Sequence, residues 1–231
     1  NIGYIGEEGN GNTESEYIMY VDPLDGTSSF TAGIPVVTIA VSLMKRVSGN
    51  NYSPVYSIIC EPLTGYAWYN LGLDTTFVSS SDNLSNCVPT CTQRGEQALV
   101  TSMFGSGTFR YLDAARDELY ARQPELKYRS CGSPALCGGL IASGTMQGLM
   151  MGGGSAAEVC AILPIIRGAK GVAVDLYGTP LETFELSEHN GKIDFVLPDG
   201  AIFATDTDLA AELVGIVSAI NSKQQLHYHP F

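Results

Sequence analysis

The segment that most constrains this chain is a short acidic turn at residues 21–30, with the sequence Val-Asp-Pro-Leu-Asp-Gly-Thr-Ser-Ser-Phe. A strand-like run at residues 17–21 leads into it. Asp22 and Asp25 lie three residues apart, with a proline between them that restricts φ and a glycine after them that relaxes the backbone. The turn can therefore point both carboxylates to the same side. Two anionic oxygen ligands at the end of a strand suit Mg²⁺, which keeps open positions for water and phosphate.

Three hydroxyl residues, Thr27, Ser28 and Ser29, follow this turn and predict the start of a short helix. The free N–H groups at a helix N-terminus bind anions such as phosphate. Carboxylates for a metal and donors for a phosphate would then lie side by side. A simple Asx-type turn is the alternative for Asp next to Pro and Gly, and the hydroxyl-rich segment favours the metal site.

The string Asp-Pro-Leu-Asp-Gly-Thr at residues 22–27 resembles the first signature of the inositol monophosphatase family. That family lies within a superfamily of Mg²⁺-dependent, often Li⁺-sensitive phosphatases that includes fructose-1,6-bisphosphatase. Gly-Glu-Glu at residues 6–8 resembles an upstream family element, and residues 30–35 resemble the continuation into the next strand. The resemblance covers most of the chain and implies an α+β fold, a layered αβαβα sandwich. In the family, Gly-Glu-Glu follows a pair of long helices that has no counterpart in this chain.

We expect two halves with the active site between them. Residues 1–86 would carry the metal turn on an antiparallel-rich sheet, and residues 87–231 would form an α/β half with a mixed sheet and the third carboxylate. Patterns of apolar and turn residues predict the remaining elements. The main ones are a polar loop at 9–15, a central strand at 36–44, a turn at 45–53, and helices that start at Ser133-Pro134, Ser155 and Asp206.

The resemblance also implies roles for single residues. The catalytic residues would be Glu7, Thr27 and Asp25, with Glu7 and Thr27 orienting the attacking water. The metal ligands would be Glu7, Asp22, Leu24 through its backbone carbonyl, Asp25 and Glu158. Phosphate and substrate would be bound by Gly26, Thr27, Ser28 and Ser133. From their spacing alone, Glu7 and Glu8 would be interpreted as two solvent-exposed carboxylates in a loop.

Glu158 is assigned from the family's second signature, Trp-Asp-x-Ala-Ala, where this chain has Ala-Glu-Val-Cys-Ala at residues 157–161. The Trp is missing and Asp is replaced by Glu, which the fructose-bisphosphatase branch also carries at this place. A longer carboxylate can still reach a metal. Ser155 and Glu158 fit a capping box as well, in which the glutamate accepts a hydrogen bond from the N-cap amide. Both interpretations remain open, and we favour the ligand.

Two further positions concern the substrate. Ser133 matches a family Gly-Thr that faces the substrate, although a role as helix N-cap explains it equally well. Met151 lies seven residues before Glu158, where inositol phosphatases have an acidic residue that binds inositol hydroxyls. A thioether accepts such hydrogen bonds poorly, which argues against inositol phosphate itself. The histidines, His189, His227 and His229, are expected at the surface.

Charge and cysteine content limit the partners. A formal net charge of −12 argues against binding nucleic acid or anionic membranes, and the chain has no apolar run of membrane-spanning length. Bound Mg²⁺ would supply the positive charge that an acidic protein needs to handle phosphate. The six scattered cysteines predict reduced thiols in a cytoplasmic protein. Cys87 and Cys91 are close enough for a disulfide or zinc half-site, but no second pair has matching spacing.

These observations predict a Mg²⁺-dependent phosphoric monoester hydrolase. Its substrate would be a small phosphate monoester of the inositol- or sugar-phosphate type, attacked in line by a metal-activated water. We expect a homodimer because members of the family are commonly dimers. The alternatives are a phosphatase for phosphoadenosine phosphate or histidinol phosphate, and a non-catalytic regulatory relative, which the missing Trp and the Asp-to-Glu change would suit.

Overall fold

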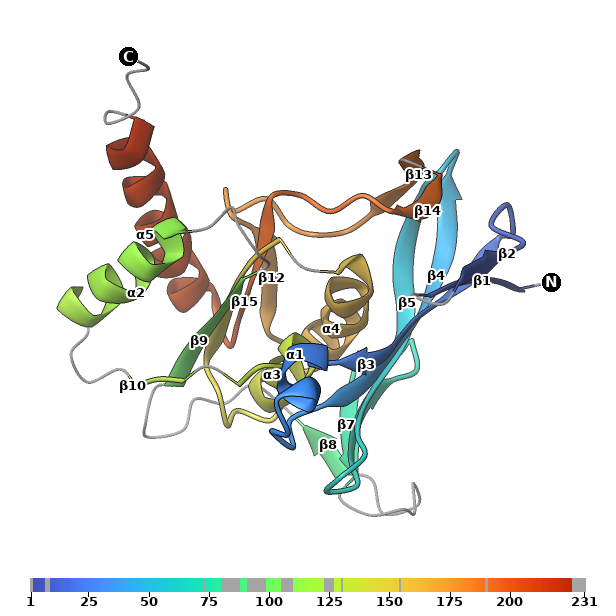
Figure 1. Ribbon diagram of the computed structural model, residues 1–231, viewed down its shortest axis with the longest axis horizontal. Coiled ribbons are helices and arrows are strands. Elements are labelled where there is room, and N and C mark those ends of the chain that lie inside the picture. Colours follow the sequence, from blue (N-terminus) through green and yellow to red (C-terminus); the bar gives the residue numbers. More distant parts are fainter. Residues whose placement is uncertain are drawn as a thin grey trace.

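The computed structural model describes most of the chain as two β-sheets and five helices (Figure 1). The described residues are 2–6, 9–72, 74–79, 88–90, 99–104, 110–122, 127–129, 131–153, 155–189 and 191–225. The helices are α1 (Thr27–Thr31), α2 (Arg110–Arg122), α3 (Pro134–Ala142), α4 (Ala156–Gly168) and α5 (Thr207–Gln225).

The larger sheet follows the order β2-β1-β3-β4-β5-β6-β7-β8. All of these neighbours pair antiparallel except β1 and β3, which run parallel. The strands are β1 (Ile2–Gly6), β2 (Gly9–Gly11), β3 (Tyr17–Asp25), β4 (Thr38–Ser48), β5 (Asn51–Glu61), β6 (Tyr66–Asn70), β7 (Thr76–Ser79) and β8 (Val88–Thr90). The expected antiparallel-rich sheet is thus present, and β3 ends in the acidic turn.

The second sheet is mixed and has five strands in the order β10-β9-β11-β15-β12. Strands β10, β9 and β11 run parallel, whereas β15 is antiparallel to both of its neighbours. The bounds are β9 (Leu99–Phe104), β10 (Lys127–Tyr128), β11 (Gly148–Gly152), β12 (Val172–Asp175) and β15 (Gly200–Ala204).

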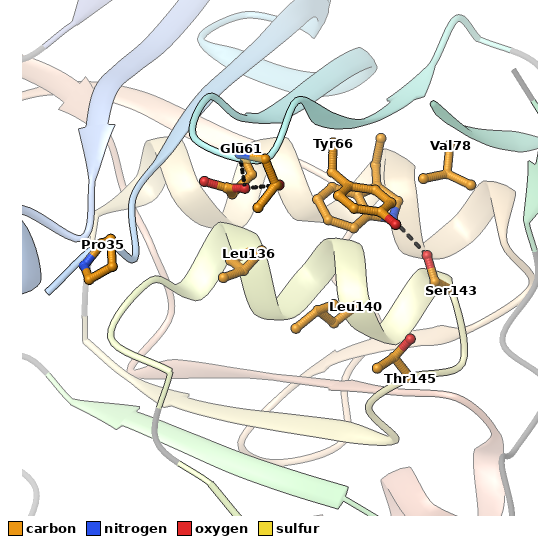
Figure 2. Close-up of a pocket in the computed structure, with 10 residues that line it drawn as sticks. Pro35, Glu61, Tyr66, Val78, Leu136, Leu140, Ser143 and Thr145 are labelled. Atoms are coloured by element: carbon orange, nitrogen blue, oxygen red, sulfur yellow. Dashed lines mark hydrogen bonds between the residues drawn. The ribbon is translucent and has the colours of Figure 1, made fainter. Parts of the chain in front are cut away.

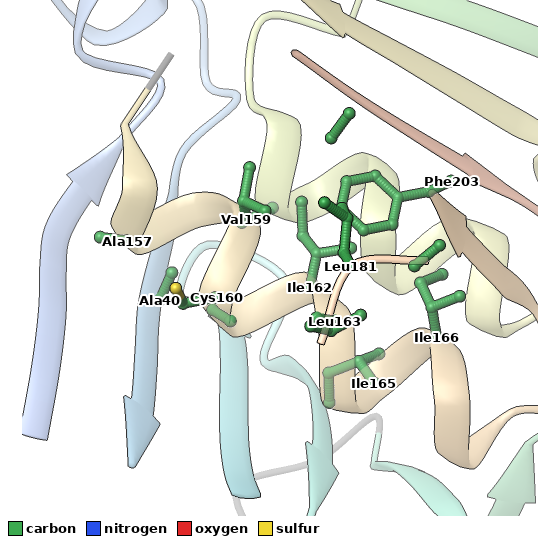
Figure 3. Packing of buried hydrophobic residues seen from close by; sticks show 14 of the residues in the cluster. Ala40, Ala157, Val159, Cys160, Ile162, Leu163, Ile165, Ile166, Leu181 and Phe203 are labelled. Carbon is green, nitrogen blue, oxygen red and sulfur yellow. The ribbon is translucent and has the colours of Figure 1, made fainter. Parts of the chain in front are cut away.

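The elements stack in layers (Figure 1). Helices α3 and α4 lie between the two sheets, while α2 and α5 cover the outer side of the second sheet. Helix α4 is buried nearly all round because it touches both sheets: its apolar residues pack with Ala40 of β4 and with Phe203 of β15 (Figure 3). The start of α4 is therefore held rigidly next to the end of β3. Within the described part of the chain, no helix combines the length and apolar character needed to span a membrane.

Several sequence expectations are confirmed. Ser133 and Ser155 are the N-caps of α3 and α4. Asp206 caps α5, since its Oδ1 accepts a hydrogen bond of 2.9 Å from the Leu209 amide. Local side-chain chemistry was sufficient to locate these helix starts.

Two loop predictions were wrong. The turn expected at 45–53 shrinks to two residues, because β4 and β5 continue as a long hairpin around Gly49, whose φ is +52°. The polar loop expected at 9–15 begins with β2, which pairs with β1. Cross-strand pairing overrides the polar composition in both places.

The hairpin formed by β13 (Phe184–His189) and β14 (Lys192–Phe195) was not predicted from the sequence. Its first residues pair with the start of β5, so a segment of the C-terminal half joins the first sheet. The predicted boundary between residues 86 and 87 lies outside the described residues, and the division into two halves stays a prediction.

Candidate active site

The segment predicted as a tight turn after residue 21 continues β3 to Asp25 and contains an Asx-type turn at Asp22. The pairing of β3 with β4 shifts register between Asp22 and Asp25, and both carboxylates are buried, with 2% and 1% exposed. Asp22 Oδ1 accepts a hydrogen bond of 3.0 Å from the Leu24 amide, which tightens the turn. Gly26 then adopts φ +91°, and a Cβ atom there would lie 2.6 Å from the Val36 carbonyl oxygen. Only glycine fits this position without moving the chain.

Asp25 is held by three donors on one of its two oxygens. Its Oδ2 accepts from Thr38 Oγ1 at 2.8 Å, from Ser133 Oγ at 2.6 Å and from the Ala135 amide at 2.9 Å. These donors come from the start of β4 and the first turn of α3, so Asp25 ties the two elements together. The other oxygen, Oδ1, is buried and accepts no hydrogen bond from the part of the chain that the structure describes. We refer to the three donors to Oδ2, which are the Thr38 hydroxyl, the Ser133 hydroxyl and the Ala135 amide, as the Asp25 clamp.

Glu158 reaches the same place from α4. Carboxylate oxygens of Asp22, Asp25 and Glu158 all lie within 4.8 Å of one another. Glu158 also completes the capping box: its Oε2 accepts from the Ser155 amide at 3.3 Å, while Ser155 Oγ accepts from the Ala157 amide at 3.2 Å. The two interpretations of Glu158 are therefore compatible, because a carboxylate has enough lone pairs to accept one amide and still face a cation.

The electrostatics of this cluster favour a bound cation. Burial raises the pKa of Glu158 to about 9, and the negative charges of Asp25 and Asp22 add to the shift. Three carboxyl groups that share a buried site cannot all ionise without a compensating positive charge. The unsatisfied Asp25 Oδ1 and the all-oxygen donor set fit a hard divalent cation such as Mg²⁺.

The predicted phosphate-binding residues surround this cluster at α1. Gly26 is the N-cap of α1, and Thr27 and Ser28 are exposed in its first turn. Thr27 Oγ1 donates a hydrogen bond of 2.8 Å to the Leu24 carbonyl, the same carbonyl that was predicted as a metal ligand. The hydroxyl is thereby oriented, and its lone pairs remain available to accept a hydrogen bond from water.

Two residues that were expected to bear on the substrate are buried instead. Ser133 is 0% exposed, and its hydroxyl donates to Asp25 while it accepts from the Leu136 amide at 3.2 Å. Its contacts are those of a helix cap that positions Asp25, and its role as a substrate ligand stays a prediction. Met151 is 1% exposed and belongs to the main core cluster.

Other predicted residues fall outside the described part of the chain: Glu7, Glu8, Cys87, Cys91, His227 and His229. Their roles stay predictions. His189 ends β13.

Sequence reasoning missed the residues that support the cluster from a distance. Thr38 and the Ala135 amide complete the Asp25 clamp. Tyr20 donates to Asp194 Oδ1 on β14 and also hydrogen-bonds Ser155, the cap of α4. These partners are separated by up to 174 positions, so no local pattern could have revealed them.

The structure also contains a mostly apolar cavity of about 590 Å³ along α3, lined in part by Leu136 and Leu140 of that helix (Figure 2). Trp68 donates to Ser143 Oγ at 2.7 Å there, and the Glu61 carboxylate already accepts from the Leu63 and Thr64 amides. The Trp68 indole and the Glu61 carboxylate are thus paired within the protein. Phosphate chemistry fits the carboxylate cluster better than this cavity.

Comparisons with known proteins identify the family of this chain. The family model described as "Inositol monophosphatase family" matches residues 2–222. The probable inositol 1-monophosphatase ImpA of Mycobacterium tuberculosis is 27% identical over 186 residues, which cover 76% of this chain and 63% of that protein. The chloroplastic bifunctional phosphatase IMPL2 of Arabidopsis thaliana is 24% identical over 164 residues, 71% of this chain and 44% of that protein. The chain thus spans less than two thirds of the length of these relatives.

Solved structures show the same fold. Mycobacterium tuberculosis SuhB superposes with a TM-score of 0.70 at 17% identity, covering 96% of this chain and 77% of that one. The suhB protein of Bartonella henselae gives 0.71 at 17% identity, covering 94% and 79%. The α+β fold of the inositol monophosphatase type is confirmed. With a family match over nearly its whole length, this chain belongs to the inositol monophosphatase family.

Proposed function

We propose that this protein is a phosphoric monoester hydrolase that uses Mg²⁺ to hydrolyse a small phosphate monoester. The observation that supports this most is the meeting of Asp22, Asp25 and Glu158 within 4.8 Å, beside a buried Asp25 oxygen that lacks a donor among the described residues. Glu7 and the Leu24 carbonyl would complete the ligand set. A divalent cation held there would stabilise charge on the phosphoryl oxygens and make a bound water more acidic.

The protein groups around the cluster have separable tasks. The Asp25 clamp fixes Oδ2 and leaves Oδ1 free for the cation. Glu158 would release its proton when positive charge enters the site, because that charge offsets the repulsion from Asp22 and Asp25. Thr27, oriented by the Leu24 carbonyl, would accept a hydrogen bond from the attacking water together with Glu7. The amides of Gly26 and Thr27 and the Ser28 hydroxyl would hold the phosphate.

For the substrate we propose a sugar phosphate or a similar small polyol phosphate. A fructose-1,6-bisphosphatase of Pyrococcus furiosus, 45% identical over 51 residues or 22% of this chain, supports a sugar phosphate. A histidinol-phosphatase of Streptomyces coelicolor, 35% identical over 49 residues or 21% of this chain, keeps histidinol phosphate as the alternative. The methionine at residue 151, where inositol phosphatases have an acidic residue that binds inositol hydroxyls, supports the same choice. We further propose a cytoplasmic homodimer.

The test is phosphate release by the full-length protein with Mg²⁺ on a panel of substrates. The panel contains inositol 1-phosphate, fructose 1,6-bisphosphate, histidinol phosphate and 3′-phosphoadenosine 5′-phosphate. For the best substrate, we expect Asp25→Asn to lower kcat/KM by at least ~1,000-fold, because it removes a charged ligand and disturbs the clamp. Removal of the metal with EDTA should do the same, and added Mg²⁺ should restore only the unmodified protein.

The matched control is Glu188→Gln, which neutralises an exposed carboxylate on β13 and should retain full activity. Equal, background-level release by the unmodified protein and by Asp25→Asn on every substrate would contradict the proposal and favour a regulatory role. A strong preference for inositol 1-phosphate would contradict the substrate assignment alone.

A further inference from the structure

The mostly apolar cavity along α3 has the size of a small-molecule site. Its volume is about 590 Å³, and pockets that bind small molecules occupy roughly 300–1,000 Å³. Leu136 and Leu140, one helical turn apart on α3, form one side of it, and Tyr66 and Trp68 of β6 also line it (Figure 2). The three carboxylates of the candidate metal site are not among the described residues that line this cavity. The cavity is therefore a second place in the fold where a ligand can bind.

Two aromatic rings form a fixed stack in the wall of the cavity. A Cβ atom at Gly139 of α3 would lie 2.5 Å from the Trp68 ring, so this ring packs directly against the helix. Its indole N–H donates to Ser143 Oγ at 2.7 Å, which fixes the plane of the ring. Tyr66 stacks on Trp68, with ring centroids 5.9 Å apart and planes inclined by 20°, and 44% of Tyr66 is exposed. Aromatic rings prefer such offset stacking, so another flat ring can extend this stack.

The charge of the cavity limits which flat molecules it accepts. Glu61 is the one charged residue among the described residues that line it, and this side chain is 6% exposed. Its oxygens accept from the Leu63 and Thr64 amides at 3.0 and 2.8 Å and from the Thr64 hydroxyl. A carboxylate accepts up to about four hydrogen bonds, so one further donor can be bound. A negatively charged ligand would instead be repelled by this buried carboxylate.

The lining also connects the cavity to the Asp25 clamp. The Leu136 side chain lines the cavity, and the Leu136 amide donates to Ser133 Oγ at 3.2 Å. Ser133 Oγ in turn donates to Asp25 Oδ2 at 2.6 Å. Pro35 lines the cavity as well, and it lies just before Thr38, the donor of the clamp that comes from β4. A molecule that packs against Leu136 and Pro35 would therefore restrain both parts of the clamp.

We propose that this cavity binds a flat aromatic molecule without negative charge, and that this ligand strengthens metal binding at the Asp25 site. Binding is independent of the proposed phosphatase function, whereas the effect on the metal rests on that function. The ring of the ligand would stack on Tyr66 and cover Leu136 and Leu140, and a hydroxyl or amino group on the ring would donate to Glu61. Because a phosphate group would face Glu61, the ligand is an effector and not the phosphorylated substrate.

Trp68 makes the binding test direct, because it is the single tryptophan of the chain and lines the cavity. The folded protein in EDTA is titrated at neutral pH with acridine, a flat uncharged molecule that absorbs where tryptophan emits. We expect saturable quenching of the Trp68 fluorescence. Quenching that does not saturate would overturn the site.

Two comparison probes test the class of ligand. Acridine-9-carboxylate has the same rings and a negative charge, and 1-adamantanol is apolar but not flat. Both should displace acridine at least ~10-fold more weakly than unlabelled acridine competes with itself, a difference of about 1.4 kcal/mol. Equal binding of acridine and acridine-9-carboxylate would overturn the role of Glu61, and equal binding of 1-adamantanol would overturn the preference for flat rings.

Thr145→Phe tests the location, because it places a ring at the exposed edge of the cavity. It should weaken acridine binding by at least ~10-fold. The control is Thr183→Phe, the same change at another exposed threonine that does not line this cavity, and it should bind acridine like the unmodified protein. Circular dichroism shows whether both variants are folded. Unchanged acridine binding by folded Thr145→Phe would overturn the location, and the probe comparison on the unmodified protein tests the proposal without any variant.

The effect on the metal site is measured by calorimetry as Mg²⁺ affinity. Saturating acridine should raise this affinity by about fivefold, the lower end of typical couplings between two sites, and Mg²⁺ should raise the affinity for acridine by the same factor. An unchanged Mg²⁺ affinity with acridine bound would refute the coupling through Leu136 and Pro35. If the protein binds no Mg²⁺ and releases no phosphate, the proposed function fails, while the quenching of Trp68 still decides whether the cavity binds its ligand.

Discussion

Helices α3 and α4 begin with the same type of cap, but the carboxylates at their starts differ in the number of hydrogen bonds that they accept. Both start at a serine N-cap whose hydroxyl accepts an amide hydrogen bond from the first turn. Both bring a carboxylate to that turn, Asp25 at α3 and Glu158 at α4. At α3 the carboxylate gains three donors on one oxygen, whereas at α4 Glu158 Oε2 accepts one amide bond of 3.3 Å.

The difference separates two tasks within one site. Three donors on one oxygen restrict the rotation of a carboxylate, so the Asp25 clamp keeps this side chain in a fixed position. Glu158 is half-buried beside two carboxylates, which favours its protonated form in the absence of a cation. The site therefore combines one fixed carboxylate with one whose charge would depend on a bound cation. The predictions below test whether the two helix starts differ in this way.

The largest expected effect is a pH-dependent loss of stability in the metal-free protein. The pKa of Glu158 is raised from 4.5 to about 9, so the native state holds a proton that the unfolded chain releases above pH 4.5. This contribution to stability is complete below pH 4.5 and is lost as the pH rises toward 9. It amounts to several kcal/mol at ~1.4 kcal/mol per pH unit. Urea unfolding in EDTA between pH 5 and pH 9 should show the decline.

Glu158→Gln isolates this contribution because it cannot titrate. Its free energy of unfolding should fall less steeply with pH than that of the unmodified protein, whereas Glu188→Gln should keep the full slope. Saturating Mg²⁺ should flatten the slope of the unmodified protein, since the cation stabilises the ionised form. Identical slopes for the unmodified protein and Glu158→Gln in EDTA would show that Glu158 is charged without metal.

The second effect concerns the other helix start. Ser133→Ala removes the cap of α3 and one charge-assisted hydrogen bond to Asp25. The sum of both losses should destabilise the protein by about 2–4 kcal/mol. Unfolding monitored by the single tryptophan, Trp68, measures it. The activity of the folded variant should fall as well, because Asp25 loses one of its three donors. A loss near 1 kcal/mol with unchanged activity would mean that Ser133 serves only as a cap.

The features of the two helix starts that depend on neighbouring residues could be predicted from the sequence. Both serine caps, the tight acidic turn and the place of Glu158 near that turn follow from short-range rules on capping, proline and glycine, together with a family resemblance. The resemblance also indicated the α+β fold. The long β4–β5 hairpin was shortened in the prediction because its strand ends are polar, and pairing with β3 and β13 decides their state instead.

The part that could not be predicted depends on distant contacts. Thr38 lies 13 positions from Asp25 and Ser133 lies 108 positions from it, so the clamp exists only in the folded chain. The raised pKa of Glu158 likewise depends on burial and on two carboxylates from β3. Local propensity carries no information on any of these.

The smallest expected effect comes from Ser155→Ala at the start of α4. The variant loses the side-chain half of the capping box, worth about 1 kcal/mol of stability. The other half survives, because Glu158 accepts from the backbone amide of residue 155, which alanine also has. Stability should therefore fall by less than in Ser133→Ala, while kcat/KM and Mg²⁺ affinity stay within about twofold, a change of less than 0.5 kcal/mol. Should Ser155→Ala lose as much activity as Ser133→Ala, the Ser155 hydroxyl and its contact with Tyr20 would be positioning Glu158, and the two helix starts would perform the same task.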